Sequence, residues 1–349
     1  MQQAYVEALC CELATRRNYI NEDIATIYLG GGTPSTLHPT QLQNIFNTIY
    51  KHFTIADNPE ITIEANPDDL SPNYLATLRY MPFNRISMGV QSFDDTQLKR
   101  LGRRHTAAKA KEAVANARNA GFENISIDLM FALPDSTIDQ WNNDLAEAIA
   151  LKPEHISAYN LTYEENTPLY NDMLCGKLKQ IDEDDNVIQF EALVDRLTSA
   201  GYRHYEISNF SRPGYESRHN SSYWHNIPYL GCGASAHSYN GEERRWNVSN
   251  ISKYIEGINE GHPCFEAEHL TAAERYNDTI LTRLRTADGL PIALIQKNFG
   301  NKLTEYMLQE ATTHITTGYL ERTPDDFLRL TKKGVFVSDA VIRDMIFVD

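Results

Sequence analysis

From residue 1 to about residue 210, short apolar runs rich in β-branched residues alternate with segments of helical periodicity. The apolar runs predict strands at Ile24–Leu29, Ile61–Ala65, Arg85–Val90, Ile125–Phe131, His155–Leu161 and His204–Ile207. The periodic segments predict helices near Tyr5–Asn18, Pro39–His52, Tyr74–Arg79, Thr106–Ala120, Thr137–Ala150 and Asp184–Ala200. Such alternation is typical of parallel α/β units, which form either a whole or partial barrel or a doubly wound sheet.

Polar and flexible residues stand at the carboxyl end of one predicted strand after another. They are the run Gly30–Pro34, Glu64 with Asn66, Gln91, Asp128, and Tyr159 with Asn160. In a parallel barrel these ends open onto one face, where side chains from different strands reach a shared ligand. A doubly wound sheet would gather its ligand groups at one switch point. The spread over five strands therefore favours an α/β barrel.

After about residue 210 the alternation gives way to a loop rich in Gly, Ser, Asn and aromatic residues. From Leu270 onward the pattern predicts helices at Thr271–Arg285, Pro291–Phe299 and Leu303–Thr316, strands at Tyr319–Arg322 and Phe327–Leu330, and a last helix at Lys332–Met345. This order resembles a winged-helix module, so DNA binding has to be considered. Residues 271–349 carry nearly equal numbers of basic and acidic side chains. We therefore expect a packing or substrate-covering role for this segment.

The charge of the whole chain excludes one class of partner. Among its 349 residues are 32 Lys and Arg against 47 Asp and Glu, which gives a formal net charge of −15. A nucleic-acid backbone needs a basic surface, so we expect no nucleic-acid partner. The sequence contains no apolar run of about 18 residues and no apolar N-terminal leader, which predicts a soluble cytoplasmic protein.

The five cysteines are odd in number and scattered, which predicts reduced thiols. They are Cys10, Cys11, Cys175, Cys232 and Cys264. None of them forms a CxxC or CxxxCxxC spacing.

The segment Gly30–Pro34, GGGTP, directly follows a predicted strand. Gly31 and Gly32 allow positive φ and a close backbone approach to a carboxylate or phosphate, and Thr33 adds a hydroxyl. The segment lacks the spacings of a P-loop and of a dinucleotide-binding turn. A tight strand-to-helix turn is the alternative, but the place of the segment on the expected ligand face favours binding.

Two acids, Glu64 and Asp128, lie within apolar strand sequences. A buried carboxylate must be paired, hydrogen-bonded or protonated, so each is either a structural ion-pair member or a ligand contact. Gln91 supplies an amide at a strand end, and Arg103 or Arg104 supplies a guanidinium group that can bind a carboxylate through two hydrogen bonds.

Several motifs, in order along practically the whole chain, carry a specific resemblance. They are YLGGGTP, ITIEANPDDL, RISMGVQSFDDTQLKRLGR, ISIDLMFALP, ISAYNLTYEENTPL, YEISNF and HNSSYW with YLGCGASAHSY. The chain resembles the radical S-adenosylmethionine (SAM) family of oxygen-independent coproporphyrinogen III oxidases. Within that family it is most similar to the HemW-like branch of haem chaperones.

The resemblance implies a fold and a first site. The fold is a partial (β/α)6 TIM-like barrel over residues 1–245, followed by a mostly helical, winged-helix-like domain over residues 246–349. SAM would lie across the carboxyl ends of the strands. By position in the motifs, its amino group would be held by Gly31, Gly32 and Thr33, its carboxylate by Arg103, and its other polar groups by Glu64, Gln91 and Asp128.

In the family, a 4Fe-4S cluster on a CxxxCxxC segment transfers an electron to SAM. That segment precedes the helix that begins here near Tyr5, and no cysteine of this chain has the required spacing. Because thiolates are the ligands of such clusters, the chain as given is expected neither to bind the cluster nor to generate the radical. We expect roughly 30 further residues to precede Met1 in the gene, the length of one strand-loop unit; a natural cluster-free relative is the alternative.

HNSSYW matches the HNxxYW motif that is associated with haem binding in the chaperone branch. The resemblance implies haem contacts by His219, Asn220, Tyr223 and Trp224, with His219 as an axial ligand of the iron. The alternative is that these residues hydrogen-bond the loop and fill core. The nearby His225, Cys232 and His237 fit no standard zinc spacing, so we expect no zinc.

The sequence therefore predicts a haem-binding chaperone that passes haem to a target protein and meets a membrane only through a partner. The enzymatic alternative is a coproporphyrinogen III oxidase, which converts porphyrinogen propionates to vinyl groups. A DNA-binding regulator is disfavoured by charge. The haem acceptor, catalytic activity and oligomeric state stay open.

Overall fold

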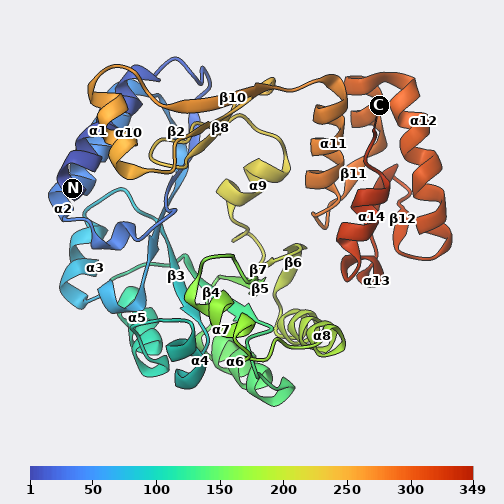
Figure 1. Cartoon of the computed structure of the whole chain (residues 1–349), viewed down its shortest axis with the longest axis horizontal. Helices are drawn as coiled ribbons and strands as arrows, with labels where there is room; N and C mark the ends of the chain where they lie inside the picture. Colours follow the sequence, from blue (N-terminus) through green and yellow to red (C-terminus); the bar gives the residue numbers. More distant parts are fainter. Residues whose placement is uncertain (349) are drawn as a thin grey trace. The chain divides into compact units, whose positions relative to one another are not determined.

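The strands predicted before residue 210 all form in the computed structural model, which describes residues 1–348. They belong to one seven-stranded sheet with the order β1-β2-β3-β4-β5-β7-β6 (Figure 1). Its strands are β1 (Ile24–Leu29), β2 (Ile55–Ala65), β3 (Arg85–Gln91), β4 (Ile125–Phe131), β5 (His155–Asn160), β6 (Arg203–Glu206) and β7 (Asn209–Ser211). Strands β2 to β5 pair in parallel, as their helical connections require.

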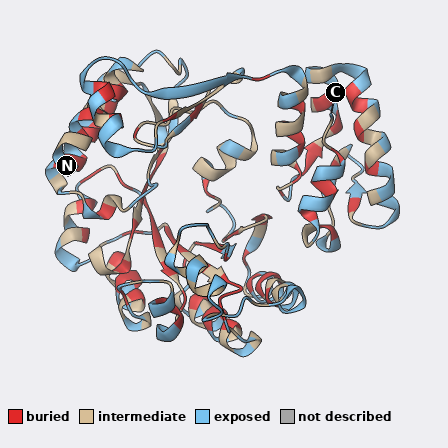
Figure 2. Cartoon of the chain, viewed as in Figure 1, coloured by how far each residue is buried: buried red, intermediate tan, exposed pale blue. Residues whose placement is uncertain are grey.

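Strand β4 shows why these apolar runs become strands. All seven of its residues are buried or half-buried, because a parallel strand is covered on both faces. Helices lie along the outer side of the curled sheet, and the buried residues follow the strands and the inward-facing sides of the helices (Figures 1 and 2). These helices are α3 (Pro72–Arg79), α4 (Asp95–Arg100), α5 (Ala107–Asn119), α6 (Ile138–Leu151) and α8 (Glu183–Ser199), while the short α7 (Pro168–Leu174) has no buried residue.

Helix α6 illustrates how the sequence positions a helix on the sheet. Thr137 caps its first turn, and Gln140 returns a hydrogen bond to the backbone of Thr137, which completes a capping box. Trp141, Leu145 and Ala148 are buried at the i, i+4 and i+7 positions. This spacing places the three side chains on one helical face.

The strand predicted at His204–Ile207, which forms as β6, departs from the parallel alternation that the sequence suggested. Strand β7 lies between β5 and β6 and is antiparallel to both. Glu206 and Asn209 face each other across a two-residue turn and are joined by a hydrogen bond between their side chains. After this tight turn the chain runs back as β7, between β5 and β6. Sequence periodicity cannot reveal a strand of only three residues.

The chain divides into two compact units. One comprises Tyr28–Thr36 and Glu60–Ser217, and the other Met1–Ile27, Leu37–Pro59 and Arg218–Asp349. The boundary near residue 245 that the resemblance implied stays a prediction.

The second unit begins with helices that flank a small sheet. Its elements before residue 270 are α1 (Gln2–Thr15), α2 (Pro39–His52), α9 (Arg218–Trp224), β8 (His237–Tyr239), β9 (Glu243–Asn247), α10 (Ile251–Asn259) and β10 (Phe265–His269). Strands β10, β9 and β8 form an antiparallel sheet in that order. Helices α1 and α10 meet in a small core of Ala8, Tyr254 and Ile258.

The C-terminal segment has a hydrophobic core of its own, centred on Tyr276, Ile295 and Met307. It contains α11 (Ala272–Arg283), β11 (Leu290–Pro291), α12 (Ile292–Thr316), β12 (Leu320–Arg322), β13 (Phe327–Leu330), α13 (Lys332–Val335) and α14 (Ser338–Asp344). Gly300 interrupts α12 with φ 79°, which agrees with the two helices predicted there. The single helix predicted at its end is instead split at Phe336 and Val337. The segment is mostly helical, as expected, and its sheet contains β11 besides the two strands that were predicted.

Candidate functional site

The glycine-rich turn meets Glu64 at the carboxyl end of β2. Tyr28 donates a hydrogen bond from its hydroxyl to Glu64 Oε1 (2.7 Å), and the Gly31 N–H donates to Glu64 Oε2 (3.1 Å). A Cβ atom on Gly30 would lie 2.4 Å from the Tyr28 ring and 2.7 Å from the Glu64 carboxyl carbon. Only glycine fits at residue 30, so the turn and the carboxylate form one unit.

The next two glycines face open space. A Cβ atom on Gly31 or Gly32 would have no neighbour within 4 Å, and Gly31 has φ 75°. Thr33 ends the turn with its carbonyl oxygen, which accepts a hydrogen bond from the Thr36 N–H (3.0 Å). The exposed backbone of Gly31 and Gly32 can therefore approach a polar ligand closely.

Arg103 lies against the carboxyl end of β3. Its Nη2 donates hydrogen bonds to Asn66 Oδ1 (2.7 Å) and to the Gly89 carbonyl oxygen (2.8 Å). Gln91 has φ 68° and lies where the register of β3 with β4 shifts, and a Cβ atom on Gly89 would touch both the Arg103 and the Gln91 side chains. Burial lowers the pKa of Arg103, whereas Asp128 and Asp68 act in the opposite direction. The bulge thus brings a guanidinium and an amide together.

Asp128 occupies the middle of β4 on the same face of the sheet as Glu64. The parallel register places Glu64 opposite Ser87, and Asp128 opposite both Gly89 and Ser157. Ser87 donates a hydrogen bond from Oγ to Asp128 Oδ1 (3.4 Å). Burial raises the pKa of Asp128 to about 6, although its hydrogen bonds to serine and the charge of Arg85 oppose this shift. The structure therefore brings Gly31, Glu64, Gln91, Arg103 and Asp128 to one region of the first unit.

Helix α9 carries His219, and both of its ring nitrogens are hydrogen-bonded. Nδ1 lies 2.8 Å from Oγ1 of Thr26 on β1, and Nε2 lies 2.9 Å from the Tyr223 hydroxyl one helical turn further on. Arg218 donates a hydrogen bond to the Asn58 carbonyl oxygen on β2 (2.5 Å). The start of α9 is thus attached to Thr26 and Asn58, which belong to its own unit.

A row of aromatic rings begins at His219. Tyr223 contacts the His219 ring edge to face at 5.1 Å between centroids, and Tyr229 contacts Tyr223 at 4.7 Å. Burial and the neighbouring Tyr229 raise the pKa of Tyr223 to about 12, so its hydroxyl is protonated at neutral pH. Nε1 of Trp224 is buried and has no hydrogen-bond partner. Together with Asn220, which is half-buried on α9, these side chains form an imidazole and aromatic cluster that we call the α9 cluster.

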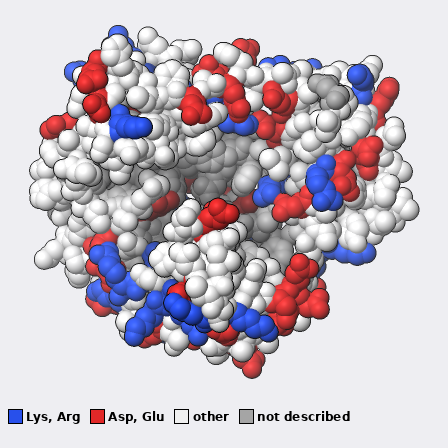
Figure 3. Space-filling model, in the orientation of Figure 1, with Lys and Arg blue, Asp and Glu red and all other residues white. Residues whose placement is uncertain are grey.

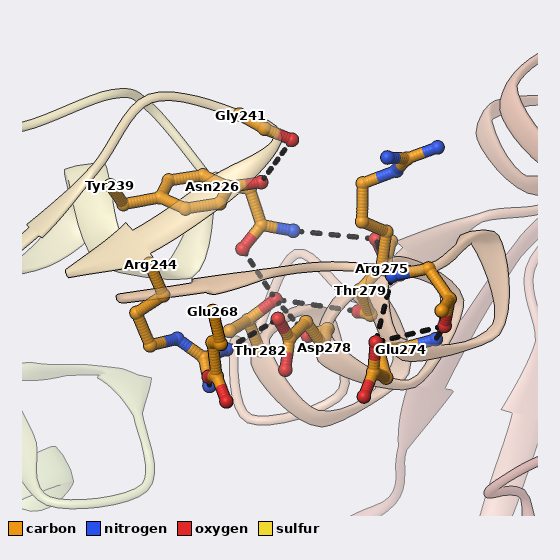
Figure 4. A network of polar contacts seen from close by, with 11 residues as sticks. Asn226, Tyr239, Gly241, Arg244, Glu268, Glu274, Arg275, Asp278, Thr279 and Thr282 are labelled. Carbon is orange, nitrogen blue, oxygen red and sulfur yellow. Dashed lines mark hydrogen bonds and ion pairs between the residues drawn. The ribbon is translucent and has the colours of Figure 1, made fainter. Parts of the chain in front are cut away.

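The other end of α9 is connected to the C-terminal segment through the network shown in Figure 4. Asn226 follows α9 with φ 53° and donates a hydrogen bond to Thr279 Oγ1 on α11 (3.3 Å). Nearby, Arg244 on β9 forms ion pairs with Glu268 on β10 (2.9 Å) and Asp278 on α11 (2.6 Å). The contacts of Asn226 and of Arg244 therefore hold α11 beside α9 and β9.

Comparison with known proteins places the chain in a family. Residues 12–148 match the radical SAM superfamily, and residues 270–337 match the HemN C-terminal domain. The heme chaperone HemW of Lactococcus lactis is 34% identical over 99% of this chain and 90% of the relative. HemW of Bacillus subtilis is 37% identical over 80% of this chain and 75% of the relative, and HemW of Escherichia coli is 32% identical over 97% and 89%. The chain belongs to the HemW family of radical SAM proteins.

The fold of this HemW family member agrees with a solved structure. Coproporphyrinogen III oxidase (HemN) of Escherichia coli superposes with a TM-score of 0.84 over 98% of this chain and 82% of that protein, at 21% sequence identity. This similarity confirms the expected partial TIM-like barrel of the radical SAM fold. At this level of identity it concerns the fold alone.

The radical SAM family implies SAM and a 4Fe-4S cluster, and the residues of this HemW family member fit the first better than the second. Open glycine backbone, a guanidinium and two carboxylates suit the charges of an amino acid moiety. Among residues 1–348, no group of three or more His, Cys, Asp or Glu side chains could hold a metal ion. The described part of the chain therefore has no site for the cluster.

Two further surface properties bear on possible partners of this HemW family member. No helix formed by the described residues is both long and apolar enough to cross a bilayer. On the face shown in Figure 3, Lys and Arg side chains are interspersed with Asp and Glu side chains.

Sequence reasoning missed three residues that contact the predicted ones. Tyr28 contacts Glu64, Gly89 contacts Arg103, and Thr26 contacts His219. The hydroxyls of Tyr28 and Thr26 interrupt an apolar strand, which is a detectable signal. The contact partner of Thr26, however, lies 193 residues away.

Proposed function

We propose that this chain binds haem at the α9 cluster through His219 and delivers it to a recipient protein. The observation that carries the proposal is the geometry of His219, whose imidazole is held by a strand at one nitrogen and covered by a partly exposed tyrosine at the other. Imidazole is a common axial ligand of haem iron. Membership of a family whose relatives are named heme chaperones supports the same function.

The residues of the α9 cluster fit such a ligand. His219 would ligate the iron, and the rings of Tyr223 and Tyr229 offer apolar faces to a planar macrocycle. The unpartnered Nε1–H of Trp224 is a donor that a polar group of a ligand can satisfy. Asn220 completes the predicted set on the same helix. Haem iron, when bound, supplies the coordination bond, and the chain supplies the ligand, its orientation and the aromatic contacts.

We also propose that the first unit binds SAM. Gly31, Gly32 and Thr33 would receive its amino group, Arg103 its carboxylate, and Glu64, Gln91 and Asp128 its other polar groups. Support comes from the open glycine backbone and from the hydrogen bonds that fix Glu64 and Arg103 in place. The proposal concerns binding only, because the described residues offer no site for the cluster.

Haemin titration followed by the Soret band tests the haem proposal. His219→Ala is expected to weaken binding by at least tenfold and to change the ligation spectrum. His225→Ala is the matched control, since His225 lies just after α9 and the one hydrogen bond described for its ring joins Nδ1 to the Ser221 carbonyl oxygen (2.6 Å). Equal binding by the His219→Ala variant and the wild type would disprove the proposed ligand.

Delivery is tested separately by mixing the haem-loaded chain with apomyoglobin. Transfer is expected to produce the absorption spectrum of haem-loaded myoglobin. It should proceed faster than the transfer of haem from serum albumin to apomyoglobin, which serves as the control. A haem-loaded chain that retains its haem under these conditions would argue against a chaperone.

A further inference from the structure

Thr26 on β1 links the large sheet to the α9 cluster. Its Oγ1 lies 2.8 Å from His219 Nδ1, and Thr26 stands at the third position of β1, far from α9 in sequence. The sequence motif HNSSYW does not include it. The contact therefore exists only because the fold brings β1 and the start of α9 together within one compact unit.

The two partners of His219 differ in their freedom to move. Thr26 is a short, β-branched residue on a paired strand, so its side chain has few available rotamers. Tyr223 is 37% exposed and reaches His219 only through the end of its side chain, at its hydroxyl and ring edge. Nε2 is consequently the ring nitrogen that a ligand can reach, whereas Nδ1 stays attached to β1.

Resting on the proposed function, we propose that Thr26 is a positioning residue for haem ligation. Its hydroxyl oxygen accepts the Nδ1–H of His219, which leaves the Nε2 lone pair for the iron. The Tyr223 hydroxyl covers Nε2 and is displaced when haem binds. A hydrogen bond of this kind to the non-ligating nitrogen fixes the tautomer and ring orientation of a metal-bound histidine and raises its basicity.

The direction of the effect follows from which nitrogen binds the metal. Loss of the Thr26 hydroxyl frees the ring to rotate and removes the acceptor that keeps the proton on Nδ1. If the iron bound Nδ1 instead, the hydroxyl would compete with it, and its removal would strengthen binding. One substitution therefore distinguishes the two ligation modes.

The test compares Thr26→Val, which keeps the shape of the side chain, with Thr26→Ser, which keeps the hydroxyl. Haem affinity is measured by Soret titration, and the iron–histidine stretching frequency by resonance Raman spectroscopy of the reduced protein. Thr26→Val is expected to weaken affinity about tenfold or more and to lower the stretching frequency. Thr26→Ser is expected to restore both. Unchanged urea unfolding of Thr26→Val shows that the fold is retained.

The outcomes separate this inference from the function on which it rests. If His219→Ala binds haem like the wild type, the proposed ligand is wrong. If His219→Ala loses ligation but Thr26→Val keeps both affinity and frequency, only the role of Thr26 is refuted. If Thr26→Val binds more tightly, the iron is bound through Nδ1 and the inference is overturned. Should the valine variant fail to fold, Thr26→Ala replaces it, with serine again as the comparison.

Discussion

Replacement of Glu12 by alanine is expected to destabilise the unit that carries the α9 cluster. Glu12 lies on α1, and its side chain is only 2% exposed. Its carboxylate accepts hydrogen bonds from Asn247 Nδ2 (2.7 Å), the Tyr254 hydroxyl (2.7 Å), the Gly233 N–H (2.9 Å) and Arg16 Nη1 (3.2 Å). These partners come from β9, α10 and the loop before β8, so a single carboxylate joins four segments.

The magnitude depends on which donors lose their only partner. Arg16 also donates hydrogen bonds to the Gly231 carbonyl oxygen and Ser238 Oγ, and Asn247 Nδ2 also donates to the Gly233 carbonyl oxygen. Among the described contacts, the buried Gly233 N–H and the Tyr254 hydroxyl have no such second acceptor. Each orphaned donor costs about 1–3 kcal/mol. Removal of one partner of a buried ion pair costs about 3–5 kcal/mol, so we expect a loss of about 4 kcal/mol.

Urea unfolding followed by circular dichroism and tryptophan fluorescence measures this loss. With a slope of about 1–3 kcal/mol per molar urea, the midpoint of the transition should fall by more than 1 M. Glu7→Ala is the matched control, because Glu7 lies exposed on the same helix and its side chain accepts one hydrogen bond, from Gln3. That control should stay within about 0.5 kcal/mol of the wild type. A Glu12→Ala variant within 1 kcal/mol of the wild type would refute the reasoning.

Three further predictions concern the SAM region and the connection of α9. Burial raises the pKa of Asp128 to about 6, above the ordinary value of 3.8. The folded protein therefore binds a proton more tightly than the unfolded chain, and the free energy of unfolding falls as the pH rises from 3.8 to about 6. Asp128→Asn should remove roughly 2 kcal/mol of this decline between pH 4 and 7, as measured by urea unfolding; an unchanged pH profile would contradict it. Arg103→Ala should weaken SAM binding at least tenfold by calorimetry, whereas Arg104→Ala, which is more exposed, should not; equal effects would refute the assignment. Asn226→Ala should lower the free energy of unfolding, measured by thermal unfolding, by about 1 kcal/mol. Asn226→Gly should lower it by less, because residue 226 has φ 53°, which glycine adopts without strain. Equal losses in the two variants would locate the effect in the hydrogen bonds of Asn226 instead.

Much of the barrel could be predicted because its signals are local. The β4 run ISIDLMF is apolar at every position except Ser126 and Asp128, and a parallel strand that is buried on both faces needs such a composition. Helix α6 likewise carries its own capping box and its own buried stripe. Strand β7 was not predicted, because three residues give no period and its pairing depends on a turn.

The candidate sites divide in the same way. GGGTP and HNSSYW are contiguous, so their glycines, histidine and aromatic residues could be named from the sequence alone. Gln91 and Arg103 lie close together because a bulge at Gly89 turns the end of β3, and no spacing in the sequence encodes that distance.

The order of residues supplies the chemical groups: a glycine turn, two strand carboxylates, an arginine and a histidine among aromatic residues. The folded chain sets the state in which each group is held. His219 has one nitrogen attached to β1 through Thr26 and the other covered by a partly exposed tyrosine. A hydrogen bond acts only over about 3 Å, and the folded backbone alone brings residues 26 and 219 within that range.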